Sequence, residues 1–348
     1  MKITDIRAVQ PVAPGSPPDW RTSLGQILVA VDTDRGLTGY GVGGGGLAAI
    51  HVVRTVLRDL LVGRDPQPVE ELAAAMSRAT LPFGRKGLAV MAQSGVDLAL
   101  WDLRGKAAGQ PIVELLGGRP RQPIPVYATV WHEVTAGQAV QFRAFKLHVG
   151  HTAGDGDPDA GGLVENVVAA VARARQTIGP DRSLMIDAWM QWDVPATLAV
   201  AQRIAPLDIG WIEEPLSPDD LAGYEELSRR CPVLIAGGEH EFTAIGFRPL
   251  IERRLHQVLQ PDVCWCGGLT ELIRIYELSA AAGLRVCPHR GAEVWALHAI
   301  AALDADPLAE SGRPWMTWVG GQPAVLDGTI QVGDAPGFGV EIDEDGLP

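Results

Sequence analysis

Residues 210–239, GWIEEPLSPDDLAGYEELSRRCPVLIAGGE, contain one complete repeat of the pattern that decides the fold. A short apolar run of strand type ends at Glu213, a helical pattern follows, and a second apolar run ends at Glu239. Short apolar strands that alternate with longer helical patterns are typical of a parallel sheet wrapped by helices. The stretch therefore predicts a βαβ unit with a carboxylate at the end of each strand.

The same alternation extends in both directions from this unit, starting near Pro125. We expect eight strands, at residues 126–130, 144–148, 184–187, 210–213, 233–239, 257–262, 285–289 and 307–310. Eight strands with a helix between most neighbours predict a closed α/β barrel.

The first third of the chain has a different pattern of predicted strands and helices. Residues 3–9 and 27–31 predict strands, and Asp34-Arg35-Gly36 marks the turn of a hairpin. Apolar residues at spacings of three and four then predict helices, at 47–61, 69–79 and 87–107. We expect three units: an α+β unit over residues 1–124, the barrel over 125–319, and a tail over 320–348 that returns to the first unit.

Polar residues close six successive predicted strands, and they recur about one βα unit apart. They are Asp187, Glu213, Glu239, Asp262, His289 and Glu310. Side chains at the carboxyl ends of barrel strands converge on one mouth. Taken singly, each acid is more often a helix cap or a surface charge. Three successive carboxylates, Asp187, Glu213 and Glu239, would repel each other unless a hard cation neutralised them, and such oxygen ligands suit Mg²⁺.

A histidine and an acid are neighbours in the same barrel order. Asp262 closes the strand before His289. A carboxylate that accepts a hydrogen bond from one imidazole nitrogen fixes the tautomer and makes the other nitrogen a better base. We therefore predict that His289 carries a proton and that Asp262 supports it.

Composition limits the partners of the chain. It has 348 residues, 47% of them apolar, and a formal net charge of −13. This length supports a large core, and the negative charge argues against nucleic acid. An anionic substrate would need a local cation, for which a bound metal is the simplest source. No signal peptide or apolar stretch of membrane length is present, so we predict a cytoplasmic protein with no membrane partner. The four cysteines are interpreted as reduced structural thiols.

Several motifs resemble one known family. The segments WIEEPL at 211–216, SGVDLALWD at 94–102 and GGE at 237–239 are similar to the mandelate racemase branch of the enolase superfamily. The resemblance runs from about Ile3 to Ile342. Within that branch, PDD at 218–220, GEHE at 238–241, LQPDVCWCGG at 259–268 and PGFGV at 336–340 resemble the rhamnonate dehydratases and related acid-sugar dehydratases.

The resemblance implies a (β/α)7β modified TIM barrel beneath an N-terminal α+β capping domain that the C-terminal tail completes. It assigns Asp187, Glu213 and Glu239 to Mg²⁺, and makes His289 the general base with Asp262 behind it. Glu310 would stabilise the enolate. The implied activity is dehydration of a sugar acid, such as an L-rhamnonate-like aldonate, to a 2-keto-3-deoxy acid, by a homo-oligomer.

The chain departs from the family on the second barrel strand. Where the wider branch has Lys-x-Lys, this sequence has Lys146-Leu147-His148. Lys146 would contribute positive charge. His148 is either a spectator that positions substrate or a second base. Two bases, His148 and His289, acting on opposite faces would make the protein a racemase or epimerase, which is the alternative function within this fold.

The substrate end of the site is less specified by sequence. Arg21 matches an Arg that rhamnonate dehydratases present from the cap, and the accompanying His has no counterpart. His132 and His240 follow strand ends and are candidates for substrate contact, with an ordinary structural role as the other interpretation.

The segment GYGVGG at 39–44 has the spacing of a dinucleotide fingerprint, but it follows a hairpin, so we interpret it as a mobile Gly-rich loop.

Two further functions lie outside the leading class. A non-catalytic sugar-acid binding protein would not need a His–Asp base, so the presence of His289 and Asp262 argues against it. A metal-dependent hydrolase usually collects His ligands, whereas this set is all carboxylate.

Overall fold

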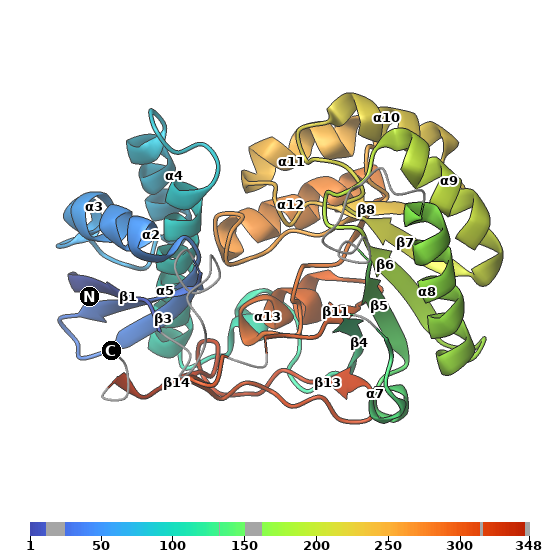
Figure 1. The fold of residues 1–348 in the computed structure, drawn as a ribbon. Coiled ribbons are helices and arrows are strands. Elements are labelled where there is room, and N and C mark those ends of the chain that lie inside the picture. The colour runs from blue at the N-terminus through green and yellow to red at the C-terminus, as the bar shows by residue number, and fades with distance from the viewer. Residues whose placement is uncertain (12–24, 132, 150–161, 314–315, 345–348) are drawn as a thin grey trace.

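The computed structural model describes residues 1–11, 25–131, 133–149, 162–313 and 316–344 (Figure 1). The chain starts with an antiparallel sheet of order β1-β2-β3, formed by Ile3–Val9, Ile27–Thr33 and Thr38–Gly43. Gly36, with φ 70°, closes the β2–β3 turn and donates its N–H to the Thr33 carbonyl at 3.1 Å. The expected hairpin is therefore confirmed.

Helices cover one face of this sheet (Figure 1). They are α2 (Gly46–Val52), a π-helical turn η1 (Val53–Leu57), α3 (Arg58–Leu61) and α5 (Leu88–Ala108). Helix α4 (Val69–Thr80) packs on α5, and the short α6 (Ile112–Leu115) packs on α5 and on the barrel helix that starts at Val294. The predicted helix over 47–61 exists, but the π-helical turn interrupts its regular α-helical pattern.

The prediction of a mobile loop at residues 39–44 is wrong for 39–43, which form strand β3. The glycines allow β3 to lie directly on the backbone of α5. A Cβ added at Gly41 would be 2.2 Å from the Gly95 carbonyl oxygen, and one at Gly39 would be 2.2 Å from the Ala99 carbonyl oxygen. These glycines therefore serve close packing rather than motion.

The second unit is a barrel of parallel strands in the order β11-β4-β5-β6-β7-β8-β9-β10. The strands are β4 (Ile124–Val130), β5 (Ala144–His148), β6 (Ser183–Asp187), β7 (Ile209–Glu213), β8 (Ile235–Gly237), β9 (Val258–Leu259), β10 (Arg285–Val286) and β11 (Ala309–Glu310). The β10 and β11 ends of the sheet meet, because Cys287 Sγ donates to the Leu308 carbonyl at 3.4 Å and the Ala292 N–H donates to the Glu310 carbonyl at 2.8 Å.

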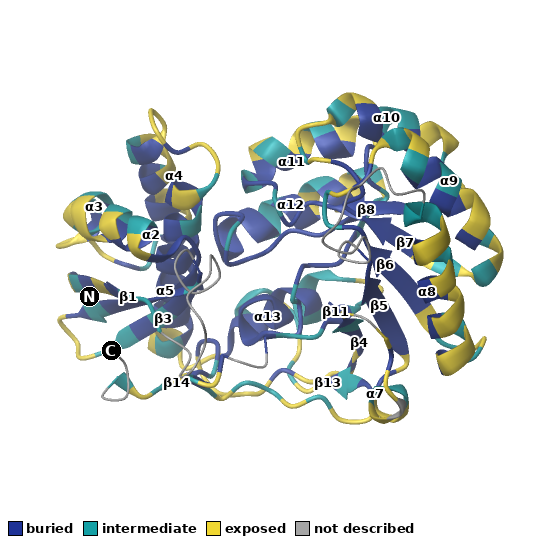
Figure 2. Cartoon of the chain, in the orientation of Figure 1, coloured by how far each residue is buried: buried dark blue, intermediate teal, exposed yellow. Residues whose placement is uncertain are grey.

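Within the described ranges, one α-helix stands between each pair of consecutive barrel strands. They are α7 (Ala136–Gln141), α8 (Leu163–Ile178), α9 (Val194–Ile204), which continues into the 3₁₀ turn η2 (Ala205–Leu207), α10 (Leu221–Arg230), α11 (Thr243–Glu252), α12 (Leu269–Ala282) and α13 (Val294–Leu303). The strands are buried while the outer faces of the helices are exposed (Figure 2). The predicted (β/α)7β barrel is therefore confirmed.

Three barrel strands end earlier than the sequence predicts. Asp187, Glu213 and Glu310 are the last residues of their strands, whereas Glu239, Asp262 and His289 lie in the loops just beyond β8, β9 and β10. The ladder stops because Pro261 and Pro288 lack an N–H and Gly238 has a φ of 122°.

The barrel interior is layered, because side chains along a strand alternate between its two faces. The lower layer is an apolar cluster of Tyr127, Ala144, Met185, Trp211, Ala236, Val258 and Cys287. Residues two positions further along the same strands include Lys146, Asp187 and Glu213, all of them buried. Polar groups thus lie above an apolar floor.

The C-terminal tail contacts both units. Strand β13 (Thr329–Ile330) pairs antiparallel with β4, and β12 (Val319–Gly320) pairs with β14 (Glu341–Ile342). The Phe338 N–H donates to Asp102 Oδ1 on α5 at 2.9 Å. The tail therefore completes the first unit, the cap, as expected. The exact divisions after residues 124 and 319 stay predictions, since β12 itself spans Val319–Gly320.

The cap is joined to the barrel between α5 and α12. Trp101 Nε1 donates to Thr270 Oγ1 at 2.9 Å, and the Thr270 N–H donates to Asp97 Oδ1 at 3.0 Å.

The four cysteines are free thiols. Among the helices that the structure describes, none has the length and apolar character needed to cross a membrane.

Candidate active site

Adjacent strands bring the predicted acids side by side at the barrel mouth. In the parallel ladder His148 is paired with Asp187, and Asp187 is paired with Glu213. All three residues are buried, with exposed fractions of 4%, 6% and 2%. The β5, β6 and β7 ends therefore present these side chains to one shared space.

A lysine lies at the centre of these carboxylates. Lys146 Nζ is 2.6 Å from Glu213 Oε1, 2.8 Å from Glu310 Oε1 and 3.6 Å from Asp187 Oδ2. Its side chain is 1% exposed. The sequence placed Lys146 near the site, but it did not indicate that one ammonium group would contact carboxylates from three strands.

Burial and mutual repulsion disturb the ionisation of this group. Burial and the nearby Glu213 charge raise the pKa of Asp187 well above its ordinary value. Burial, partly offset by Lys146, raises the pKa of Glu213 to about 7. Burial opposes the charge on Lys146, but attraction to Glu213 and the other acids keeps its pKa well above the usual value. The acids outnumber the cation that neutralises them.

His289 and Asp262 form the expected pair. Asp262 Oδ2 is 3.0 Å from His289 Nδ1, and Asp262 Oδ1 accepts the Cys264 N–H at 2.7 Å. The other ring nitrogen, Nε2, is 2.9 Å from Glu239 Oε2 and 3.1 Å from the donor Nε of Arg290. Asp262 thus fixes one side of the ring and leaves Nε2 at the mouth.

The two contacts of Nε2 correspond to two protonation states. An imidazolium donates to Glu239, whereas a neutral ring with its proton on Nδ1 accepts from Arg290. Burial disfavours the charged ring, but Glu239 and Asp262 outweigh burial and raise the pKa of His289 to about 10. A cation on Glu239 would weaken that attraction and favour the neutral, basic form.

Glu310 is held from three sides. Its Oε1 accepts from Thr129 Oγ1 and from Lys146, and its Oε2 accepts the Arg290 N–H at 2.8 Å. Burial favours the neutral acid, but Lys146, His289 and these hydrogen bonds lower the pKa of Glu310 to about 2. Glu310 is therefore an ionised acceptor in this arrangement.

A second His–carboxylate pair was missed by the sequence analysis. His240 Nδ1 is 2.6 Å from Glu214 Oε2 and 3.4 Å from Glu239 Oε1, and the Gly238 N–H donates to Glu214 Oε1 at 3.1 Å. Glu214 has a φ of 35°, a rare value for a non-glycine residue, which breaks the strand alternation after Glu213. The doubled acid Glu213-Glu214 was the signal that could have found it.

A group of three ligand-type side chains meets closely among the described residues. Ligand atoms of Glu214, Glu239 and His240 all lie within 4.8 Å of one another. The expected metal ligands share only Glu239 with this group, and the Glu213 carboxylate instead accepts from Lys146 and Gln260. The all-oxygen donors Asp187, Glu213 and Glu239 and their excess negative charge nevertheless fit a hard divalent cation.

His148 is held by aromatic rings. The Trp131 ring stacks on it at a centroid distance of 4.1 Å, and the Trp189 ring lies 6.3 Å away. His148 Nε2 is 4.0 Å from Asp187 Oδ2, so this side chain faces the same mouth. Arg21 and His132, which the sequence predicts to contact substrate, lie outside the described residues.

Trp265 links the cap to this mouth. Its ring centroid is 5.9 Å from that of His240 and 6.1 Å from that of His289. A Cβ on Gly44 would be 2.7 Å from Trp265 Nε1, so the cap glycine permits the indole to lie there. Trp265 was not among the residues predicted from the sequence to form the site.

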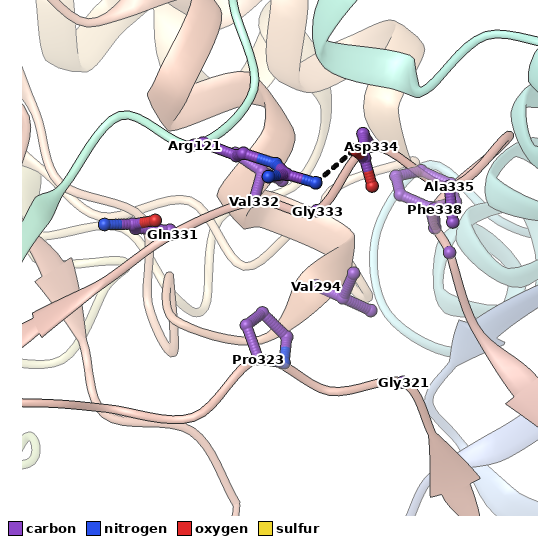
Figure 3. A pocket seen from close by; sticks show the side chains of 11 residues that line it. Arg121, Val294, Gly321, Pro323, Gln331, Val332, Gly333, Asp334, Ala335 and Phe338 are labelled. Atoms are coloured by element: carbon purple, nitrogen blue, oxygen red, sulfur yellow. Dashed lines mark hydrogen bonds and ion pairs between the residues drawn. The ribbon is translucent and has the colours of Figure 1, made fainter.

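A separate pocket of about 420 Å³ lies along the tail (Figure 3). It is lined by Arg121, Val294, Gly321, Pro323, Gln331, Val332, Gly333, Asp334, Ala335, Phe338 and Gly339. Arg121 and Asp334 form an exposed ion pair at its edge. None of the predicted site residues that the structure describes lines it, so it is not the candidate active site.

A (β/α)7β barrel beneath an α+β cap, with acids and a His–Asp pair at one mouth, defines a barrel enzyme suited to acid–base chemistry. Residues 130–346 match the family model described as enolase C-terminal domain-like. Residues 20–117 match the N-terminal domain model of mandelate racemase and muconate lactonizing enzyme. The chain belongs to the mandelate racemase and muconate lactonizing enzyme family of the enolase superfamily, as its motifs predicted.

Individual relatives support the same assignment. An L-rhamnonate dehydratase of Saccharopolyspora erythraea is 38% identical over 92% of this chain and 83% of its own. A solved rhamnonate dehydratase of Gibberella zeae complexed with Mg is 30% identical, with a TM-score of 0.87 over 99% of this chain and 94% of that chain. A solved 3,6-anhydro-D-galactonate cycloisomerase of Zobellia galactanivorans is 29% identical, with a TM-score of 0.87 over 99% and 98%. The expectation of an enzyme is therefore confirmed.

Proposed function

We propose that this chain is a Mg²⁺-dependent dehydratase that removes water from a sugar acid, an L-rhamnonate-like aldonate, to give a 2-keto-3-deoxy acid. The observation that carries the proposal is the His289–Asp262 pair, at 3.0 Å, beside a carboxylate cluster at one barrel mouth. The 38% identity to an L-rhamnonate dehydratase supports the substrate class.

Asp187, Glu213 and Glu239 would hold the metal. The charge balance of the cluster supports this assignment, because the single ammonium of Lys146 faces the carboxylates of Asp187, Glu213 and Glu310. Bound Mg²⁺ would polarise the substrate carboxylate and make the adjacent C–H bond more acidic.

His289 is proposed to take the α-proton through Nε2. Asp262 accepts a hydrogen bond from the Nδ1–H group, so the ring keeps the tautomer in which Nε2 is basic. The protonated His289 can then give its proton to the departing β-hydroxyl, so that water leaves and the product tautomerises to the keto acid. One residue would thus serve as base and then as acid.

Lys146 and Glu310 would act on the negative charge that develops at the substrate carboxylate. An ionised Glu310 accepts hydrogen bonds and does not donate them. We therefore propose that Glu310 contributes by fixing the Lys146 ammonium and the Arg290 N–H at the mouth, where both can oppose negative charge.

A racemase or epimerase is the second candidate, and His148 favours it. His148 is buried at the mouth, next to Asp187, on a strand that β11 and β4 separate from β10. A base in that position could deliver a proton to the substrate from a side that His289 does not reach. The cycloisomerase neighbour also indicates that other reactions of sugar acids occur on this fold.

A substrate screen separates these functions. Purified protein with Mg²⁺ is incubated with a library of aldonic and aldaric acids in D₂O, and products are followed by ¹H NMR and by semicarbazone formation. A 2-keto-3-deoxy product supports the dehydratase, whereas deuterium exchange with inversion and no keto acid supports the epimerase. Absence of both across the library would contradict the proposal. Roles of Arg21, His132 and His240 in substrate contact, a cytoplasmic location and a homo-oligomer stay predictions.

A further inference from the structure

Lys146 has the contacts of a buried counter-cation. Its ammonium lies 2.6 Å from Glu213 and 3.6 Å from Asp187, two of the proposed metal ligands, and 2.8 Å from Glu310, which is not one. The side chain is 1% exposed. Its charge therefore acts on these carboxylates with little screening by water.

Glu213 Oε1 cannot contact the Lys146 ammonium and a divalent metal ion equally closely at the same time. In this arrangement its closest cationic partner is Lys146. A divalent ion bound to the same carboxylate would repel the ammonium, since like charges at such separations in a buried site repel strongly. Glu310 offers the lysine another partner at 2.8 Å, and Thr129 and the Arg290 N–H hold that carboxylate in place.

We propose that Lys146 is a positioning residue that competes with the metal: it neutralises Asp187 and Glu213 in the metal-free protein and shifts its contact toward Glu310 when a divalent cation binds. Its charge thereby keeps the carboxylates together before loading and weakens the final affinity for Mg²⁺. This inference rests on the metal site of the proposed function.

The test uses neutral replacements of the lysine in the full-length protein. Lys146→Met removes the charge and keeps the chain length, and Lys146→Gln also keeps a hydrogen-bond donor. After treatment with EDTA, Mg²⁺ binding is measured by isothermal titration calorimetry at pH 9, where proton uptake by the carboxylates competes least. Both variants should bind Mg²⁺ roughly tenfold more tightly than the unchanged protein or better. Lys146→Arg, which keeps the charge, should not show this gain.

Thermal unfolding gives a second readout that does not depend on turnover. Without metal, the neutral variants should melt at a lower temperature than the unchanged protein, because buried carboxylates lose their partner. With excess Mg²⁺ this difference should shrink, because the ion replaces the lost charge.

Lys106→Met is the matched control. Lys106 Nζ lies 2.6 Å from the buried carboxylate of Asp102 in the cap. Its replacement should lower the melting temperature with and without Mg²⁺ and leave the Mg²⁺ affinity unchanged. The control therefore separates loss of a buried ion pair from competition with the metal.

The outcomes distinguish this inference from the proposed function. If the unchanged protein binds Mg²⁺ but the neutral variants bind it equally or more weakly, the inference fails. Lys146 would then hold the metal-ligating carboxylates in position without competing with the ion. Failure of both neutral variants to fold with excess Mg²⁺ would overturn it as well. If the unchanged protein binds no Mg²⁺, the metal site of the proposed function itself fails.

Discussion

Replacement of Asp262 by Asn should put the proton of His289 on the wrong nitrogen. The Cys264 N–H donates to Asp262 Oδ1 at 2.7 Å, so the amide oxygen of an asparagine would occupy that position. Its NH₂ group would then face His289 Nδ1, which lies 3.0 Å from Oδ2. His289 would have to accept at Nδ1 and carry its proton on Nε2, where it cannot act as a base.

The size of the effect follows from the same distance. With 3.0 Å between Nδ1 and Oδ2, the attraction of Asp262 for the imidazolium formed during turnover is about 5 kcal/mol at an effective dielectric constant of about 20. Loss of that attraction corresponds to a roughly 10³- to 10⁴-fold lower kcat. The rate of keto-acid formation is measured with the best substrate from the screen, and Mg²⁺ binding is measured by calorimetry on the same preparation.

Asp97→Asn is the matched control for this experiment. Asp97 is as fully buried as Asp262, and its Oδ1 also accepts a backbone N–H, that of Thr270. This control should lose stability but keep its turnover per folded molecule. A kcat for Asp262→Asn within about tenfold of the unchanged enzyme, with Mg²⁺ binding intact, would refute the tautomer argument.

Three other predictions concern the main base, the second base and the cap. His289→Asn should abolish turnover while leaving Mg²⁺ binding by calorimetry nearly intact, and unaltered turnover would exclude this residue as the base. His148→Asn should lower kcat for dehydration less than about tenfold if the protein is a lyase; complete loss of solvent-deuterium incorporation in NMR would instead support the epimerase. Gly41→Ala should lower the free energy of unfolding by roughly 3 kcal/mol, because its Cβ would lie 2.2 Å from the Gly95 carbonyl oxygen. Gly137→Ala, at a position with nothing within 4 Å, is the control, and equal denaturant midpoints for these two variants would contradict the packing argument.

Residue periodicity was enough to predict the barrel and the gathering of its polar strand ends. Asp187, Glu213 and Glu310 end their strands as expected, because the side chains at the ends of parallel strands point to one mouth. The strands before Glu239, Asp262 and His289 proved shorter, since a hydrogen-bonded ladder needs the N–H groups that proline lacks and the regular φ that Gly238 does not have.

Contacts between residues far apart in sequence were harder to predict. The glycines of β3 look like a flexible loop until the partner helix α5 is known. They are needed because the strand packs directly against the backbone of Gly95 and Ala99 on that helix. The pairing of His240 with Glu214 likewise depends on an unusual φ of 35°. Lys146 was recognisable as a cation, but its three carboxylate partners come from separate strands.

The participation of both ends of the chain in the cap has a consequence for synthesis and for engineering. Asp102 receives one N–H from Tyr40 near the start of the chain and another from Phe338 near its end. During translation the barrel sequence leaves the ribosome before the segment that completes the cap. The barrel can therefore begin to fold while the cap still lacks its C-terminal part. For the same reason, grafting a foreign cap to redirect specificity requires two inserts, one from each terminus, and a single N-terminal cassette would leave Asp102 Oδ1 without the N–H of Phe338.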